Sequence, residues 1–258
     1  MAVRGRGGDR DVESLIAVVA LGAAAGGFVQ GLSGFAFGLV AQAIWAWTLD
    51  PALAGPLTVF GSLLGQILGI GAIRRGFDAR RAAPFILGGL LGVPLGVALL
   101  HRIDPDWFRA GVGLLLLVWC PAMLLARALP RITRGGRLAD AAVGLAGGVM
   151  GGLGGLTGPA PTLWVTLRGW GRDAQRAVFQ AFTLVMQAMT MTVYVASGTV
   201  TPEVATLCLV AAPALLLPTL LGLRLYRRFS DIAFQRIVLG LLAVSGLLLV
   251  TAAVPRLL

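Results

Sequence analysis

The chain has 258 residues, of which 57% are hydrophobic and only 12% are charged, and its mean hydropathy is +0.88. A soluble domain averages about 25% charged residues, and this chain has no Lys or Arg from Asp11 to Ile73, so we exclude a soluble globular protein. The net charge of +10 comes from arginine alone, since the sequence contains no lysine. The arginines lie in short links between apolar stretches, which is typical of membrane topology rather than of a nucleic-acid-binding face.

The first half begins with a short polar tail and a long apolar region from Val12 to Leu49. Glycines near Gly31 to Gly34 interrupt this region, so it predicts two helical pieces rather than one. Asp50 followed by Pro51 indicates a helix N-cap with proline at the first helical position. A span is therefore expected from there to about Ile73. Two further spans are expected, over Ala82 to Leu100 and Ala110 to Ala126.

From Leu138 the same plan repeats. Residues Gly26 to Gly34 read GGFVQGLSG and Gly147 to Gly155 read GGVMGGLGG, with five of nine positions identical at a constant offset of 121. One glycine-interrupted segment in each half is typical of transporters built from repeats, whose binding site lies near the membrane midplane. A second interrupted pair is expected over Leu138 to Leu167, followed by spans over Ala177 to Ala196, Ala205 to Leu223 and about Ala233 to Val250.

The predicted fold is all-α, a polytopic membrane helical bundle of about eight to ten segments. It is divided into an N-terminal repeat, residues 1–137, and a C-terminal repeat, residues 138–258. The basic links make Pro51 to Ile73 run inward and its repeat, Ala177 to Ala196, run outward. The halves are then inverted, provided that each glycine-broken pair makes two passes. Three arginines oppose this arrangement, because it leaves them outside: Arg4, Arg6 and Arg10.

Glycine-clustered segments 121 residues apart, second spans led by aspartate and a chain of 258 residues resemble the TauE/SafE sulfite-exporter family over nearly the whole chain. The resemblance implies a multi-pass transporter of the bacterial inner membrane, with a small anion such as sulfite or sulfoacetate as its substrate. It is compatible with coupling to protons or to the membrane potential, and with a homo-oligomer. The second glycine segment has Gly154 in place of Ser33, so substrate contacts are expected to differ between the halves.

A small anion needs positive potential without a permanent charge that would hold it too tightly. Broken helices supply it, because their ends expose N–H groups and glycine lets a ligand approach them. Polar side chains beside the breaks and glutamines at mid-span add donors. The candidate substrate-binding residues are Gln30, Gly31, Ser33, Gly34, Gln66, Gly155, Thr157, Gly158 and Gln187, with Gln42, Thr58, Gln180 and Thr183 as weaker candidates.

Each candidate has a purely structural alternative. Four glycines have the small-xxx-small spacing of helix packing in membranes: Gly27, Gly31, Gly148 and Gly152. The glutamines also suit interhelical hydrogen bonds. Asp50 and Asp173 fit helix N-caps, although a carboxylate in either place is also suited to coupling transport to protons. Tryptophans are expected at span ends, namely Trp45, Trp47, Trp107, Trp119, Trp164 and Trp170.

Enzyme motifs are missing from the sequence. It lacks a lysine for a phosphate-binding loop, an H-E-x-x-H pair and a C-x-x-C pair, so we expect no enzyme, no metal and no cofactor. The main hypothesis is a secondary anion transporter that works by alternating access around the broken helices. The alternative is a non-transporting membrane anchor or assembly subunit, and a weaker third hypothesis is the membrane subunit of an ATP-dependent carrier.

Overall fold

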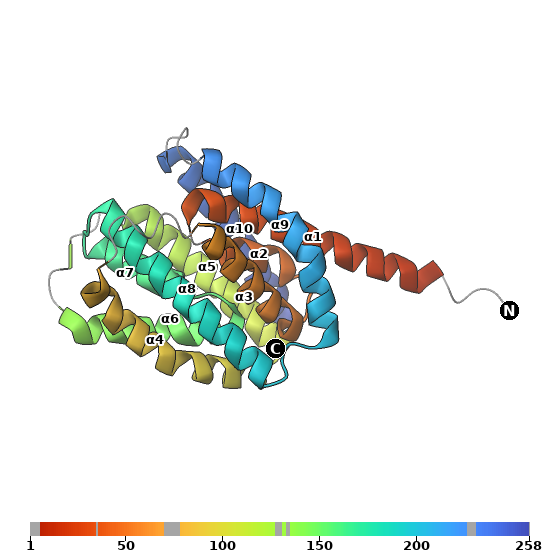
Figure 1. Ribbon diagram of the computed structural model, residues 1–258. Coiled ribbons are helices and arrows are strands. Elements are labelled where there is room, and N and C mark those ends of the chain that lie inside the picture. Colours follow the sequence, from red (N-terminus) through yellow and green to blue (C-terminus); the bar gives the residue numbers. More distant parts are fainter. Residues whose placement is uncertain are drawn as a thin grey trace.

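The computed structural model describes residues 6–34, 36–69, 78–126, 131–132, 135–225 and 231–257. Within these residues the chain forms ten α-helices and no strand, which confirms the all-α prediction (Figure 1). In chain order the helices are α1 (Arg6–Ser33), α2 (Phe37–Trp45), α3 (Pro51–Leu68), α4 (Ala79–Leu100), α5 (Pro105–Leu125), α6 (Gly136–Gly154), α7 (Pro159–Leu167), α8 (Arg172–Ala196), α9 (Pro202–Leu225) and α10 (Asp231–Leu257).

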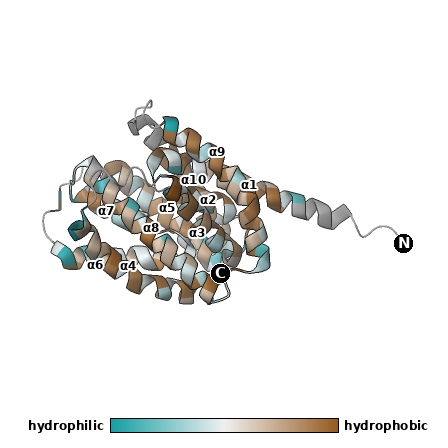
Figure 2. Ribbon diagram, in the orientation of Figure 1, coloured by the Kyte–Doolittle hydropathy of each residue, from teal (hydrophilic) through white to brown (hydrophobic). Residues whose placement is uncertain are grey.

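Seven of the described helices are long and apolar enough to cross a membrane. These candidate spans are Glu13–Ser33, Pro51–Leu68, Ala79–Leu100, Pro105–Leu125, Ala177–Ala196, Pro202–Leu225 and Val238–Pro255. Figure 2 shows hydrophobic residues along the whole length of the bundle helices. Their outward faces carry leucines, which a lipid surrounding can accept. The protein is therefore a multi-pass membrane protein.

The first glycine break folds α1 and α2 into a helical hairpin. Trp45, the last residue of α2, donates its indole N–H to the carbonyl oxygen of Val18 at 3.1 Å. Phe37, the first residue of α2, lies against Gly26 further along α1, where a Cβ would be 3.0 Å from its ring. The chain therefore turns back after Ser33, and α2 runs antiparallel to α1. With nine residues α2 is about 13.5 Å long.

The second glycine break forms a hairpin of the same kind from α6 and α7. Thr157 lies against Gly151, and Pro161 lies against Gly147, where a Cβ would be 3.1 Å from the proline ring. Trp164, near the end of α7, donates to Asp140, near the start of α6, at 2.7 Å. Both interrupted regions were predicted to contain two helical pieces, and both do.

Glycines bring pairs of helices into backbone contact. α4 packs extensively on α6, and α1 lies beside α9 (Figure 1). A Cβ at Gly148 would meet the backbone of Gly89, and one at Gly27 would lie 2.8 Å from the carbonyl oxygen of Leu215. Gly152 and Gly31 face α4 and α9 in the same way. The small-xxx-small packing alternative thus describes the surroundings of all four glycines.

Helices that stand at equivalent places in the two halves run antiparallel where they touch. Gly55, near the start of α3, lies against Tyr194, near the end of α8, where a Cβ would be 3.2 Å from the tyrosine hydroxyl. Gly69, just after α3, lies near Gln180, in the first half of α8, where a Cβ would be 4.0 Å from the side-chain nitrogen. On α5 and α10, Gly113 faces Val250 and Gly246 faces Leu116. Inverted halves require these directions. The repeat itself stays a prediction.

Two aspartates were expected to be helix N-caps, and the structure shows only one of them in that position. Asp50 caps α3, because its Oδ1 accepts a hydrogen bond from the backbone N–H of Ala52 at 3.0 Å. The same expectation for Asp173 is wrong, since α8 begins at Arg172 with Gly171 as its N-cap. Asp173 therefore lies inside the first turn of the helix.

The tryptophans do not share one environment. Trp47 and Trp107 are exposed, as expected for a membrane interface. Trp45 ends α2 but is buried, and so is Trp119 on α5, with exposed fractions of 0% and 4%. Both indole N–H groups bind backbone carbonyls inside the bundle, which is how a buried tryptophan satisfies its donor.

Candidate functional site

Buried polar side chains follow one face of α3 and one face of α8, and these antiparallel helices contact each other. On α3 they recur every four residues, and on α8 every three or four, so each set shares one helix face. We call these seven residues the polar track: Thr58, Ser62 and Gln66 on α3, and Gln180, Thr183, Gln187 and Thr190 on α8. None is more than 3% exposed. The track is sealed from solvent in this conformation.

The first break is held against α3 by a glutamine. Gly34 follows α1 with φ of 86°, a left-handed conformation that favours glycine. Its N–H donates to the carbonyl oxygen of Gln30 at 2.7 Å, and its own carbonyl oxygen accepts from Nε2 of Gln66 at 2.8 Å. Two predicted site residues, Gly34 and Gln66, are therefore in direct contact.

The second break has the same bond in the other half. Gly155 caps α6 with φ of 73°, and its carbonyl oxygen accepts from Nε2 of Gln187 at 2.8 Å. The same amide nitrogen lies 3.3 Å from Oγ1 of Thr157. Three predicted site residues, Gly155, Thr157 and Gln187, are thus brought together. Because both amide hydrogens have acceptors here, the donors of Gln187 hold the break rather than pointing to a ligand.

A bond between the halves runs across the centre of the site. Gln42 on α2 donates from Nε2 to the carbonyl oxygen of Gly154 and to Oγ1 of Thr58, both at 3.1 Å. Thr58 also lies against Gly155, where a Cβ would be 2.7 Å from its methyl group. Gln42 and Thr58 were weaker candidates in the sequence, yet they join the first hairpin to the second break.

The remaining predicted residues serve local contacts. Gln30 donates from Nε2 to the carbonyl oxygen of Ser62 at 3.0 Å, and Oγ of Ser33 accepts from the N–H of Ala36 at 3.1 Å. Gly31 packs on α9. The structure therefore does not bring these three residues to the track as free donors, although Gln30 does touch it through Ser62.

The two short helices start differently. α7 follows its N-cap Gly158 and begins with Pro159, and Pro161 follows two residues later. Because proline has no N–H, the first three residues of α7 carry one donor. The first turn of α2 carries three, and its Gly38 approaches the carbonyl oxygen of Gly155, with a built Cβ 3.0 Å away. Backbone donors at a helix start are thus concentrated at α2.

Several buried atoms of the site have no hydrogen-bond partner among the described residues. On α8 they are Oγ1 of Thr183, Oγ1 of Thr190, and Oε1 of Gln180 and of Gln187, and on α2 there is Oε1 of Gln42. A buried polar atom without a partner costs about 1–3 kcal/mol, so such atoms call for a physical reason. The two hydroxyls are donors that an oxyanion accepts, and the amide oxygens are acceptors.

Charged side chains are excluded from the track and begin at the end of α7. Neither α3 nor Ala177–Ala196 contains one. The guanidinium of Arg168 lies over the rings of Trp164 and Trp170, at 5.9 and 5.7 Å from their centroids. Its Nη1 is buried, is 3.9 Å from Oδ1 of Asp140, and has no hydrogen-bond partner among the described residues.

Sequence reasoning missed two supports of this site. Trp119 on α5 donates from Nε1 to the carbonyl oxygen of Pro159 at 2.8 Å and so fixes the start of α7. Asp140, 5% exposed, accepts from Trp164 beside Arg168. Their positions were signals, because a tryptophan near the far end of a span and an acid within an apolar region both need a specific partner. No group of three His, Cys, Asp or Glu in the described part of the chain is placed to hold a metal ion.

Comparison with known protein families identifies the family of this chain. A family model described as Sulfite exporter TauE/SafE matches residues 18–249, which include both helix breaks and the whole polar track. The chain belongs to the TauE/SafE family. Members of this family are membrane transporters rather than enzymes, so the protein is a multi-pass transporter with a small anionic substrate. No curated protein and no solved structure gives a match.

Proposed function

We propose that this TauE/SafE protein is a secondary transporter that carries sulfite or a small organosulfonate across the bacterial inner membrane. One observation carries the proposal. Buried hydroxyls of Thr183 and Thr190 lie on one face of α8 without a partner among the described residues, and the same face holds a broken helix through Gln187. An unpaired hydroxyl alone does not mark a ligand site, since Oγ1 of Thr219 is also unpaired in the α1–α9 packing contact. The two hydroxyls on α8 share their face with the bond that holds a helix break, and this combination supports a ligand site.

A neutral site suits a substrate that must also leave. A charged side chain at mid-membrane costs at least about 2.5–3.5 kcal/mol on insertion scales, and the track avoids one. Hydrogen bonds from neutral donors to a charged ligand contribute about 1.5–3 kcal/mol each. Two threonine hydroxyls and the N–H groups at the start of α2 therefore bind an oxyanion without trapping it. Oxyanion geometry then matters more than total charge.

Two breaks at different depths give the site two gates. Gly155 lies beside Thr58 and Gly34 beside Gln66, and these α3 residues are eight positions apart, about 12 Å along the helix. Movement of either hairpin opens one end of the sealed track. Gln42 links the hairpins through Gly154, so its bond is expected to break as one half moves against the other. Equivalent helices that run antiparallel support inverted halves, 1–137 and 138–258, as the basis of alternating access.

Arg168 extends the proposal to the basic side of the bundle. Its ring contacts with Trp164 and Trp170 fix the guanidinium at the end of α7, and its Nη1 remains a buried donor. Asp140, 3.9 Å from this nitrogen, offsets part of the charge. The remaining positive field raises the local concentration of anions, and the unbonded Nη1 offers a first contact before the neutral track. We place the cytoplasmic entrance here, because the basic links lie on this side.

Counterflow in proteoliposomes tests the proposal. Vesicles loaded with unlabelled sulfite or sulfoacetate are expected to take up the labelled anion transiently, and Gln187→Leu is expected to remove this uptake. Gln175 provides a matched control, since it lies on the same helix but donates to the carbonyl oxygen of Trp170 at 2.6 Å, away from the track. Lack of uptake of both anions by well-folded wild-type protein would show that neither is the substrate and would overturn the proposal.

A further inference from the structure

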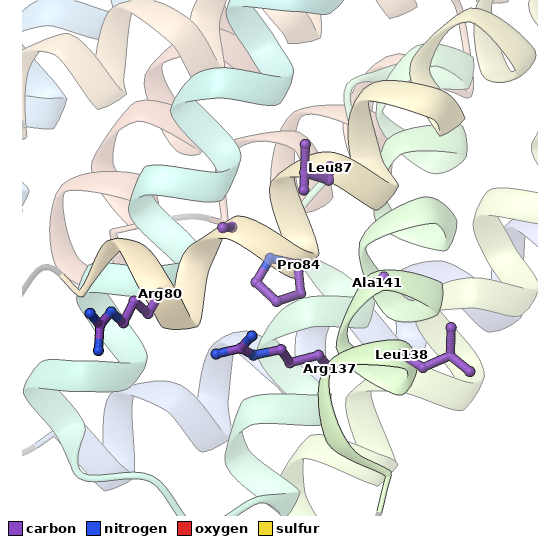
Figure 3. A pocket seen from close by; sticks show the side chains of 7 residues that line it. Arg80, Pro84, Leu87, Arg137, Leu138 and Ala141 are labelled. Carbon is purple, nitrogen blue, oxygen red and sulfur yellow. The ribbon is translucent and has the colours of Figure 1, made fainter.

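A groove lies between the starts of α4 and α6, separate from the polar track (Figure 3). Its cavity volume is 620 Å³. The lining residues are Arg80, Ala83, Pro84 and Leu87 on α4, and Arg137, Leu138 and Ala141 on α6. Figure 3 shows the Arg137 side chain extending beneath Pro84, on the side where Arg80 projects. Two basic side chains thus line one side of an otherwise apolar groove.

The groove follows from how α4 and α6 pack. The helices run parallel, and glycines on α4 let their backbones touch: Gly88 lies against Ala141 and Gly92 against Leu145. The close approach continues to the starts of both helices, where small residues, Ala83 on α4 and Ala141 on α6, line the groove beside the longer side chains.

The side chains of both arginines in the groove are unpaired among the described residues. Arg80 and Arg137 are exposed, and neither has an ion-pair partner among the described residues. Arg81, next to Arg80, behaves differently: its Nε is 3.2 Å from Oδ2 of Asp78, and its guanidinium lies 5.4 Å from the Trp170 ring centroid. The free pair therefore fits a phosphate, which arginine binds through several N–H groups.

Below the arginines, α4 presents an apolar strip to the lipid. Four leucines recur every four residues and share one face: Leu87, Leu91, Leu95 and Leu99, which are 64%, 69%, 59% and 44% exposed. The strip is about 18 Å long, slightly more than one leaflet of a hydrocarbon core of about 30 Å. A free anion has no use for such a strip, but an acyl chain does.

We propose that this groove binds an anionic phospholipid of the surrounding membrane. The lipid phosphate lies between Arg80 and Arg137, and one acyl chain lies along the leucine strip of α4. The headgroup then bridges the start of α4, in the first half of the chain, and the start of α6, in the second half. Lipid binding here does not depend on which anion the polar track carries.

Native mass spectrometry and thermal unfolding of the purified protein test this site. The probes are phosphatidylglycerol and phosphatidylcholine, each added to detergent micelles at equal concentration. Wild-type protein is expected to retain more phosphatidylglycerol than phosphatidylcholine, and its unfolding temperature is expected to rise more with phosphatidylglycerol. Each basic residue near a membrane surface contributes about fivefold to anionic-lipid affinity. Arg80→Gln/Arg137→Gln should therefore lose about 25-fold, whereas Arg81→Gln, whose partner is Asp78, should keep the preference.

Two further measurements separate the lipid from other sources. Leu91→Asn leaves both arginines in place but interrupts the strip, so it is expected to weaken phosphatidylglycerol binding. Inorganic phosphate at millimolar concentration is expected not to compete. The proposal is overturned if the double arginine variant keeps the wild-type preference for phosphatidylglycerol. It is also overturned if inorganic phosphate displaces bound phosphatidylglycerol, or if Leu91→Asn binds phosphatidylglycerol as tightly as wild type. Sulfite counterflow does not enter these readouts.

Discussion

Gln66 and Gln187 stand 121 positions apart, and each donates its side-chain amide to the carbonyl oxygen of a left-handed glycine, over the same distance of 2.8 Å. The two bonds hold the ends of α1 and α6 to the helices that carry the polar track. In a membrane interior a bond of this kind has no competition from water. Both glutamines therefore position a break, and Oε1 of Gln187 is buried with no hydrogen-bond partner among the described residues.

Replacement of Gln187 by Leu should weaken anion affinity about tenfold to hundredfold. The variant loses the bonds to Gly155 and Thr157 that hold the second break. Two neutral hydrogen bonds are worth about 0.5–1.5 kcal/mol each, and the anion affinity falls because the break no longer keeps the shape of the site. Initial rates of counterflow over a range of anion concentrations give the affinity. Gln66→Leu should act similarly on the first break, and Gln175→Leu should not. Normal anion affinity in both Gln187→Leu and Gln66→Leu would show that these glutamines serve only helix packing.

Thr183→Val separates binding from stability. Oγ1 of Thr183 is buried and has no partner among the described residues, so its removal should leave thermal stability unchanged or slightly higher. If the hydroxyl donates to the substrate, the anion concentration at half-maximal flux should rise about tenfold. Thr192→Val is the control, since this exposed hydroxyl bonds Ala188 within its own helix. A drop in stability without a change in flux would contradict the assignment.

The glycines should divide into two classes when each is replaced by Ala. At Gly155, alanine must hold φ of 73°, at a cost of about 1–2 kcal/mol, and would press on Thr58. Folded protein is expected with little transport. At Gly148, the new methyl meets the backbone of Gly89, so the yield of folded protein should fall. Gly111, with nothing near its built Cβ, is the control. Size-exclusion profiles and counterflow measure the two effects, and equal loss of folding at both positions would contradict them.

Much of the helix order follows from the sequence, because glycine runs, proline after aspartate and basic links act locally. The breaks at Gly34 and Gly155 were predicted on that basis. Of the two glutamines expected at mid-span, Gln187 lies well inside α8, whereas Gln66 lies two residues before the end of α3. The hydrogen-bond partners of individual side chains were not predicted. Trp45 and Trp119 have the residue type of an interface belt, but the backbone carbonyls of Val18 and Pro159 give them buried acceptors. Asp173 has the type of an N-cap, yet Gly171 takes that position. Such outcomes depend on neighbours distant in the chain.

Inverted halves predict which side each link faces. Single cysteines at Arg131 and Gly198, in a background without Cys120 and Cys208, should be labelled from opposite sides of the membrane by an impermeant maleimide. Arg131 lies in a basic link and Gly198 in a link without basic residues, so the cytoplasmic side is expected for Arg131. The same accessibility for both positions would rule out the inverted arrangement.

Ionic strength should distinguish the entrance from the binding site. Arg168 lies at the end of α7 with a buried Nη1 that has no hydrogen-bond partner among the described residues, and an arginine that attracts anions from solution acts through a field that salt screens over about 8–10 Å. Arg168→Gln should therefore slow flux at low salt and match wild type at high salt. Gln187→Leu should be impaired equally at both, because the buried track is shielded from solvent ions. Arg102→Gln, an exposed arginine beyond the other end of α4, is the matched control and should behave as wild type. If Arg168→Gln instead removed binding at every salt concentration while Gln187→Leu bound normally, the substrate site would lie at the guanidinium and its two tryptophans, and the neutral track would be wrong.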